Sequence, residues 1–225
     1  EKITLLLSHI KQRKFVLPFQ GGFDGANPAA QKKTGADITN VNTQGFDISS
    51  TSAAGYTAYK KALNAVSNPD EFDINMLVTP GVLHSLHPSI TNYAISKAEE
   101  RGDTFYILDP VKYGDSIATA TATIEALDTN YAATYYPWVK IVDRNTALPV
   151  WVPPSVVLAG TIAFTDKVAH EWFAPAGLNR GGLTTVTEAQ TRLTHDERDE
   201  LYEARINPIA SFPGQGVCVW GQKTL

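Results

Sequence analysis

Cysteine is almost missing from this sequence, because Cys218 is the only one among 225 residues. A single thiol excludes an internal disulfide and the zinc frameworks that need several cysteines. Cys218 also lies inside an apolar run at residues 217–220, where burial favours the unreactive thiol. A G-x-S-x-G motif is absent as well, so the sequence offers no candidate for nucleophilic catalysis.

Long apolar runs and strong charge of one sign are also lacking. The longest apolar stretch, near residues 156–164, is interrupted by Gly160 and Thr161 and is far shorter than the ~20 residues that cross a bilayer. The net charge is −4, and the one basic cluster, KQRK at residues 11–14, is short. We therefore expect a soluble globular chain that neither inserts into a membrane nor binds nucleic acid.

The first part of the chain, residues 1–52, is set apart by its composition. A short extended piece is expected at residues 14–19, and residues 21–52 are rich in Gly, Asn, Asp, Thr and Ser. These residue types favour turns, which predicts a mostly loop-like segment. We divide the chain into this loop-rich part, 1–52, and an α/β domain, 53–225.

Helical and strand patterns alternate from residue 53 onward. Apolar spacing and end signals predict three helices, at residues 56–66, 88–102 and 117–127, and three strands, at 74–78, 104–108 and 138–142. The alternation predicts an α/β fold with a mostly parallel or mixed sheet flanked by helices.

Three further elements are predicted in the second half of the chain. Residues 148–152 are expected to form an edge strand, because Pro149 cannot donate to a central ladder. Thr194 and Glu197 fit a capping box, which starts a helix that Asn207 and Pro208 end. Residues 217–220 are the last predicted strand.

The segment PPSVVLAGTIAFTDKV, residues 153–168, predicts a helix that is apolar around nearly its whole circumference. Prolines are tolerated in its first turn, and we expect its first half to be buried on most sides. Small residues at Ala159, Gly160 and Ala163 would let a sheet or another helix approach closely. We therefore expect Gly160→Leu to prevent folding.

His170 and Glu171 follow as a pair that could suggest a metal site. The zincin pattern needs a second histidine four residues later, where this sequence has Ala174. We interpret the pair as the solvated last turn of the helix, where a histidine suits the dipole. Trp172 and Phe173 would then anchor the helix exit to the core.

Two other patterns have an ordinary reading beside a functional one. His84 and His87 could face one way, but no third ligand accompanies them, so we interpret them as polar residues ahead of Pro88. The NRGG run at residues 179–182 could bind an anion, but its composition is also that of a flexible surface turn.

Asp109 and Asp143 are the strongest enzymatic candidates. Each directly follows a predicted strand, and doubly wound folds bind ligands at the carboxyl ends of parallel strands. Against this, the sequence contains neither G-x-G-x-x-G nor a P-loop, and both residues could simply cap turns. The alternative function is therefore a doubly wound ligand-binding domain or hydrolase that uses Asp109 and Asp143.

Six motifs occur in a fixed order along the chain. They are GGFDG at residues 21–25, TPG at 79–81, DTFYILD at 103–109, the segment from PP to APAG at 153–177, INPI at 206–209 and WGQKTL at 220–225. With these motifs the chain resembles the contractile tail sheath proteins of myophages, and the residues of the motifs are most similar to those of the T-even type. The resemblance covers most of the chain and indicates a core fragment without the family's N-terminal and C-terminal regions.

The resemblance implies a structural virion protein rather than an enzyme, with no cofactor, metal or catalytic residue. Its subunits would stack as hexameric rings around a tail tube and contract to drive the tube through the host envelope. Further implied partners are the baseplate and the tail terminator, and the implied locations are the virion and, during assembly, the host cytoplasm. A sheath homologue from a tail-like injection machine or bacteriocin fits as well.

The resemblance also bears on the ends of the chain. In this family, terminal arms add strands to a neighbour's C-terminal domain, and the sequence stops where that domain would begin. We therefore expect the isolated chain to be monomeric. Residues 1–10 would be either the trailing edge of an inserted protruding domain or the first core strand.

Overall fold

The structure is a computed structural model that describes residues 48, 50–144 and 146–225. All elements below belong to the compact unit Ala36–Leu225. The extended piece at residues 14–19 and most of the predicted loop lie outside the described residues. The division of the chain at residue 52 therefore stays a prediction.

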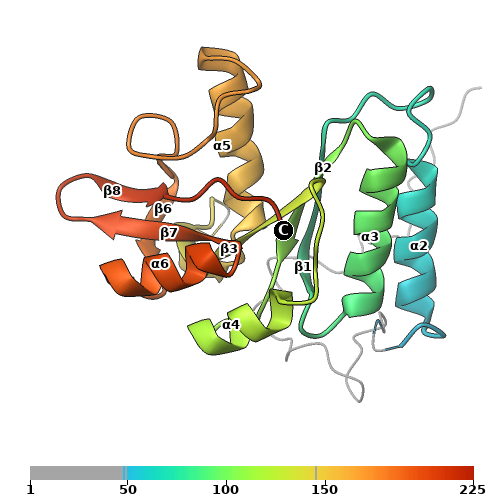
Figure 1. The fold of residues 1–225 in the computed structure, drawn as a ribbon, viewed down its shortest axis with the longest axis horizontal. Helices are drawn as coiled ribbons and strands as arrows, with labels where there is room; N and C mark the ends of the chain where they lie inside the picture. Colours follow the sequence, from blue (N-terminus) through green and yellow to red (C-terminus); the bar gives the residue numbers. More distant parts are fainter. Residues whose placement is uncertain (1–47, 49, 145) are drawn as a thin grey trace, which may run out of the picture. The chain divides into compact units, whose positions relative to one another are not determined.

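The larger sheet has the strand order β1-β2-β3-β7-β8 (Figure 1). Its strands are β1 (Met76–Leu83), β2 (Phe105–Asp109), β3 (Ala132–Tyr136), β7 (Ile206–Phe212) and β8 (Gly216–Val219). β1, β2, β3 and β7 are parallel to one another, and β8 is antiparallel to β7. The predicted α/β class with a mixed sheet is confirmed.

Helices pack on both faces of this sheet. They are α2 (Ala54–Ala65), α3 (Pro88–Arg101), α4 (Ile117–Ile124), α5 (Ser155–Val168) and α6 (His195–Glu203). Because side chains alternate along a strand, β2 sends Tyr106 and Leu108 into a core shared with α2, α3, α4 and α6, and Ile107 into a core shared with α5. We call these the α3-side core and the α5-side core.

A second sheet has the order β5-β4-β6 and is antiparallel throughout. Its strands are β4 (Val139–Val142), β5 (Pro149–Val152) and β6 (Val186–Ala189). The predicted edge strand at 148–152 is confirmed as β5. The prediction that residues 138–142 continue the parallel sheet is wrong, because that place is taken by β3, which ends three residues before β4 begins.

β7 is a central strand where the sequence indicated only a helix end. The capping box of Thr194 and Glu197 does start α6, but Asn207 and Pro208 lie in β7 and are buried. Proline is tolerated here because β7 changes partner at this point, pairing with β3 up to Pro208 and with β8 from Ile209.

The side-chain amide of Asn207 ties this central strand to the final segment. Its Nδ2 donates to the Thr134 carbonyl (3.1 Å) and to the Lys223 carbonyl (2.7 Å), and its Oδ1 accepts from the Lys223 amide (2.7 Å). Leu225 is consequently buried in the α3-side core, next to the start of β3.

Candidate functional site

Asp109 and Asp143, the two enzymatic candidates, lie in different sheets. Asp109 ends β2 and is 2% exposed. Asp143 follows β4, in the hairpin to β5, where its carboxylate accepts a hydrogen bond from Thr146 Oγ1 (2.8 Å). The structure does not bring the two carboxylates together, so a hydrolase that uses both is not supported.

Asp109 instead fastens α5 to the larger sheet. Its Oδ1 accepts from the Ser155 amide (3.1 Å) and its Oδ2 accepts from Ser155 Oγ (2.6 Å), at the first residue of the helix. Burial raises the pKa of Asp109 to about 7, although the two hydrogen bonds from Ser155 act in the opposite direction. We call this pair the Asp109–Ser155 clasp; its role is to hold the start of α5 against the end of β2.

His84 and His87 serve the turn between β1 and α3 rather than a shared ligand. His84 Nδ1 lies 2.6 Å from Thr91 Oγ1, and His87 Nδ1 accepts from the Leu83 amide (3.3 Å). Burial lowers the pKa of both imidazoles, which favours their neutral forms. The ordinary reading of this pair, as local polarity ahead of α3, agrees with these contacts.

Metal and thiol chemistry find no support in the described part of the chain. Within residues 48, 50–144 and 146–225, no three His, Cys, Asp or Glu side chains are grouped as metal ligands. Cys218 is buried in β8, and burial raises the pKa of its thiol. Among the described helices, none has the length and apolar content that crossing a bilayer would require.

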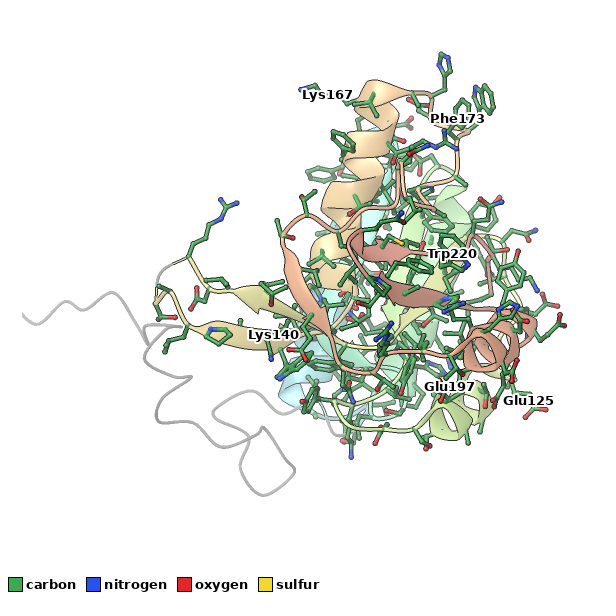
Figure 2. All side chains as sticks on the ribbon, turned by 90° about the vertical axis from the view of Figure 1, so that its left-hand side faces the viewer. Glu125, Lys140, Lys167, Phe173, Glu197 and Trp220 are labelled. Atoms are coloured by element: carbon green, nitrogen blue, oxygen red, sulfur yellow. The ribbon has the colours of Figure 1, made fainter. Side chains whose placement is uncertain are left out.

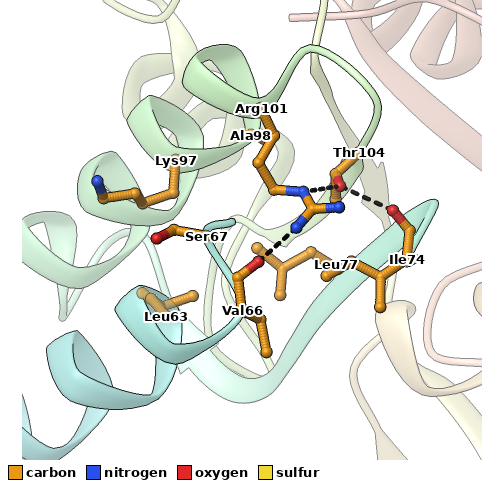
Figure 3. Close-up of a pocket in the computed structure, with 9 residues that line it drawn as sticks. All are labelled: Leu63, Val66, Ser67, Ile74, Leu77, Lys97, Ala98, Arg101 and Thr104. Carbon is orange, nitrogen blue, oxygen red and sulfur yellow. Dashed lines mark hydrogen bonds between the residues drawn. The ribbon is translucent and has the colours of Figure 1, made fainter. Parts of the chain in front are cut away.

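A small cavity lies between α2, α3 and the start of β1 (Figure 3). Arg101 lines it, and the Arg101 side chain is only 2% exposed. Its guanidinium donates to the carbonyls of Val66 (2.6 Å) and Phe72 (2.9 Å), and to Thr104 Oγ1 (2.9 Å). Because these hydrogen bonds join the ends of α2 and α3 to the loop before β1, the cavity is part of the scaffold.

The first half of α5 is buried on most sides, as the sequence predicts, but one mainly apolar face of the helix is exposed along its length. Val157 and Leu158 enter the α5-side core, and the buried hydroxyls of Thr161 and Thr165 donate to carbonyls four residues earlier. Six residues of α5 are exposed and recur at helical spacing on one face. One of them is Lys167, and the other five are apolar or small: Val156, Gly160, Ala163, Phe164 and Val168. We call these five residues the α5 ridge.

The expectation for Gly160 is also wrong. A Cβ atom built on Gly160 has no atom within 4 Å, and both Gly160 and Ala163 are exposed. In this chain the small residues therefore do not admit a close neighbour, and Gly160→Leu has no steric reason to prevent folding.

The segment after α5 carries a stacked aromatic group on the surface. His170 stacks on Trp172 at 5.6 Å between ring centroids, Trp172 stacks on Phe173 at 4.4 Å, and the Arg180 guanidinium lies 4.4 Å from the Phe173 ring. Trp172 is 77% exposed, so the prediction that it anchors the helix exit to the core is wrong. Figure 2 shows Lys167 and Phe173 at this end of α5.

The loop that follows is fixed by its backbone, although its composition suggested a flexible turn. The Gly181 amide donates to the Gly177 carbonyl (2.8 Å), and the Val219 amide donates to the Gly181 carbonyl (2.8 Å). A Cβ atom at Gly181 would come within 2.8 Å of the Ala176 Cα and the Val219 carbonyl oxygen. Only glycine therefore fits without movement where this loop crosses β8.

These contacts describe a scaffold with one unpartnered apolar face and no assembled catalytic group among the described residues. A family model described as the phage tail sheath protein central domain matches residues 31–225. The chain belongs to the phage tail sheath family. The order of motifs from TPG to WGQKTL lies inside the matched range, so the sheath resemblance seen in the sequence is confirmed.

Curated relatives carry the same description. The tail sheath protein of Vibrio phage KVP40 is 29% identical over 233 aligned residues, which cover 99% of this chain and 33% of that protein. The tail sheath protein of Enterobacteria phage T4 is 33% identical over 112 residues, which cover 50% of this chain and 16% of that protein. The chain thus spans about a third of the KVP40 sheath protein.

Solved structures of contractile machines share the sheath fold. The contracted sheath complex of an extracellular contractile injection system, PVC, aligns with a TM-score of 0.56 at 26% identity, over 72% of this chain and 44% of that chain. The baseplate of the anti-feeding prophage contains a chain that aligns with a TM-score of 0.55 at 27% identity, over 72% of this chain and 41% of that chain.

Proposed function

We propose that this chain is the core of a subunit of a contractile tail sheath, which polymerises around a tail tube and contracts to drive the tube through the host envelope. The match of the sheath central-domain model to residues 31–225 carries the proposal. The similarity to a contracted sheath complex adds support at the level of the fold.

The proposed sheath function also implies the partners of this chain. Other sheath subunits, stacked as hexameric rings, are the main partner, and the tail tube, the baseplate and the tail terminator are further partners. The virion is the site of action, and the host cytoplasm is the site of assembly. The relatives come from phages, and the solved structures come from an anti-feeding prophage and an extracellular contractile injection system, so the proposal covers phage tails and tail-like machines.

A structural role without catalysis, cofactor or metal completes the proposal. The carboxylate of Asp109 is occupied by Ser155, and that of Asp143 by Thr146, at separate places in the fold. Replacing both aspartates by asparagine should therefore leave the assembly of a full-length sheath protein largely intact. Loss of a ligand-binding or hydrolytic activity in this double variant, with assembly unchanged, would instead favour the enzymatic hypothesis.

The most direct test is expression of the full-length protein that contains this chain, followed by electron microscopy. We expect tubular polymers whose helical repeat comes from stacked rings. The isolated chain of 225 residues, by contrast, should scatter light as a monomer at micromolar concentration. A full-length protein that stays monomeric under conditions in which related sheaths polymerise would contradict the proposal.

A further inference from the structure

We propose that the α5 ridge is a contact surface between sheath subunits and that its occupant is a second copy of this chain. The inference rests on the proposed sheath function and adds to it the surface through which neighbouring copies meet.

The ridge differs from ordinary exposed surface in its composition. Val156, Phe164 and Val168 are 40%, 53% and 54% exposed, and they lie on one face of the helix with the small residues Gly160 and Ala163. A helix with one face in the core normally presents polar residues on the other face. Here the outward face carries Val156, Phe164 and Val168 with a single charged residue, Lys167, while the buried face combines Val157 and Leu158 with the hydroxyls of Ser155, Thr161 and Thr165.

The helix is also held rigidly in place, as a contact surface requires. The Asp109–Ser155 clasp fixes its first residue to β2. Thr165 Oγ1, near its last turn, lies within 3.4 Å of the Arg180 carbonyl in the loop that crosses β8. A partner would therefore meet a preformed apolar surface and would lose little free energy in ordering it.

The size of the surface favours a contact that is repeated in a polymer. With Trp172, the ridge exposes an apolar area on the order of a few hundred Å². A stable interface between two proteins buries about 800 Å² on each partner, so the ridge alone would not hold a separate dimer together. In an open helical assembly every copy makes the same head-to-tail contact, and further contacts add to it.

The small residues explain how the second copy would approach. Gly160 and Ala163 carry less side chain than Val156 and Phe164, and a Cβ placed at Gly160 meets no atom of another element within 4 Å. A side chain or helix of the neighbouring subunit can approach the α5 backbone at these small residues. The approach that the sequence suggested for these small residues would then occur between copies rather than within one.

Crosslinking tests the identity of the occupant. A photoreactive phenylalanine analogue is placed at Phe164 in the full-length sheath protein, and isotopically heavy and light preparations are mixed, assembled with tail tube protein and irradiated. We expect crosslinked peptide pairs that combine heavy and light sheath peptides. Crosslinks to the tube protein alone, only to the same copy, or none at all in well-formed sheaths would overturn the proposal.

Substitution tests the contribution of the ridge to assembly. Phe164→Glu should raise the critical concentration for polymerisation of the full-length protein by at least about tenfold, while the melting temperature of the 225-residue chain changes little. The matched control is Leu148→Glu, because Leu148 is 55% exposed at the hairpin between β4 and β5 and lies outside the ridge. The control should shift the critical concentration by less than about twofold.

The outcomes separate the two proposals. Normal polymerisation of Phe164→Glu, or equal losses for both variants, would overturn the assignment to the ridge and leave the sheath function standing. Failure of the unsubstituted full-length protein to polymerise would overturn the sheath function, and the subunit contact with it.

Discussion

α3 and α5 are two helices of 14 residues that pack on the same strands, β1 and β2, but on opposite faces of the sheet. α3 buries Ile90, Ala94, Ile95 and Ala98, and its exposed residues are polar apart from the first-turn Pro88. α5 buries three hydroxyl side chains beside Val157 and Leu158, and it exposes the α5 ridge.

The two helices therefore differ in the composition of their exposed faces. α3 follows the pattern of a helix between a core and water. α5 has apolar residues on both sides, which is the pattern of a helix between a core and a second protein surface. In the isolated chain, substitutions on the inner faces of the two helices should therefore destabilise the fold alike, whereas the outer faces should respond differently.

Truncating a buried side chain on the inner face of either helix should destabilise the chain most. Leu158→Ala and Ile90→Ala should each destabilise the chain by about 2–5 kcal/mol, because both side chains are almost fully buried. Urea denaturation followed by circular dichroism measures both. A loss of less than ~1 kcal/mol for Leu158→Ala alone would mean that α5 does not pack as firmly as α3.

Alanine substitutions at Gly160, in α5, and at Gly181, in the loop after it, should have opposite effects on stability. Gly181→Ala should cost about 1–3 kcal/mol, because its methyl group would meet the backbone of Ala176 and Val219. Gly160→Ala should be neutral or stabilising by up to ~1 kcal/mol, because alanine is the better helix former and nothing obstructs it. Equal melting temperatures of the two variants would contradict this account.

The Asp109–Ser155 clasp predicts a dependence of stability on pH. With its pKa raised to about 7, folded Asp109 retains a proton that the unfolded chain has already released. Stability should therefore be greatest below the ordinary pKa of aspartate and fall as pH rises toward 7, by at most ~1.4 kcal/mol per pH unit from this group.

Asp109→Asn isolates that contribution, because the amide does not titrate. The difference in unfolding free energy between the original chain and the variant, measured in urea from pH 4 to pH 8, should shift in favour of the variant as pH rises. Ser155→Ala is the companion variant: it removes the Oγ donor that lowers the pKa of Asp109, and should extend the fall in stability to higher pH. A difference that does not vary with pH would rule out a titrating Asp109.

The smallest effect is expected on the outer face of α5. Phe164→Ser should change the stability of the isolated chain by less than ~0.5 kcal/mol, because its side chain is largely in water. Thermal melting in parallel with the original chain measures this. A marked destabilisation would show that the ridge is covered within one chain.

The sequence contained enough information for the elements whose patterns are local. α3 runs from Pro88 to the residue before Gly102, as its proline and glycine signals predict, and α6 begins at the predicted capping box. The strands β3 and β7 were not predicted, because whether their residues form strands depends on the neighbouring strands in the sheet. AATYY becomes a strand between β2 and β7, and Pro208 is tolerated only because β7 exchanges partners beside it.

The candidate site, too, was only partly predictable from local sequence patterns. Asp109 was identified as the residue that closes β2, but its partner Ser155 is 46 residues away and no local pattern connects them. The exposure of Phe164 and Trp172 could not be read from apolar periodicity, because an apolar face has the same sequence whether it meets its own core or another subunit. The order of the sheath motifs supplied the function that local chemistry could not.

The most direct test of the central claim is the reactivity of a cysteine at the ridge in two states. Val168→Cys in the full-length protein is treated with a maleimide before and after assembly, and the labelled peptide is quantified by mass spectrometry; buried Cys218 serves as an internal reference. If α5 faces a second subunit, the labelling rate at residue 168 falls at least about tenfold on assembly, as expected for a surface removed from water at an interface. An unchanged rate in intact sheaths would contradict the claim.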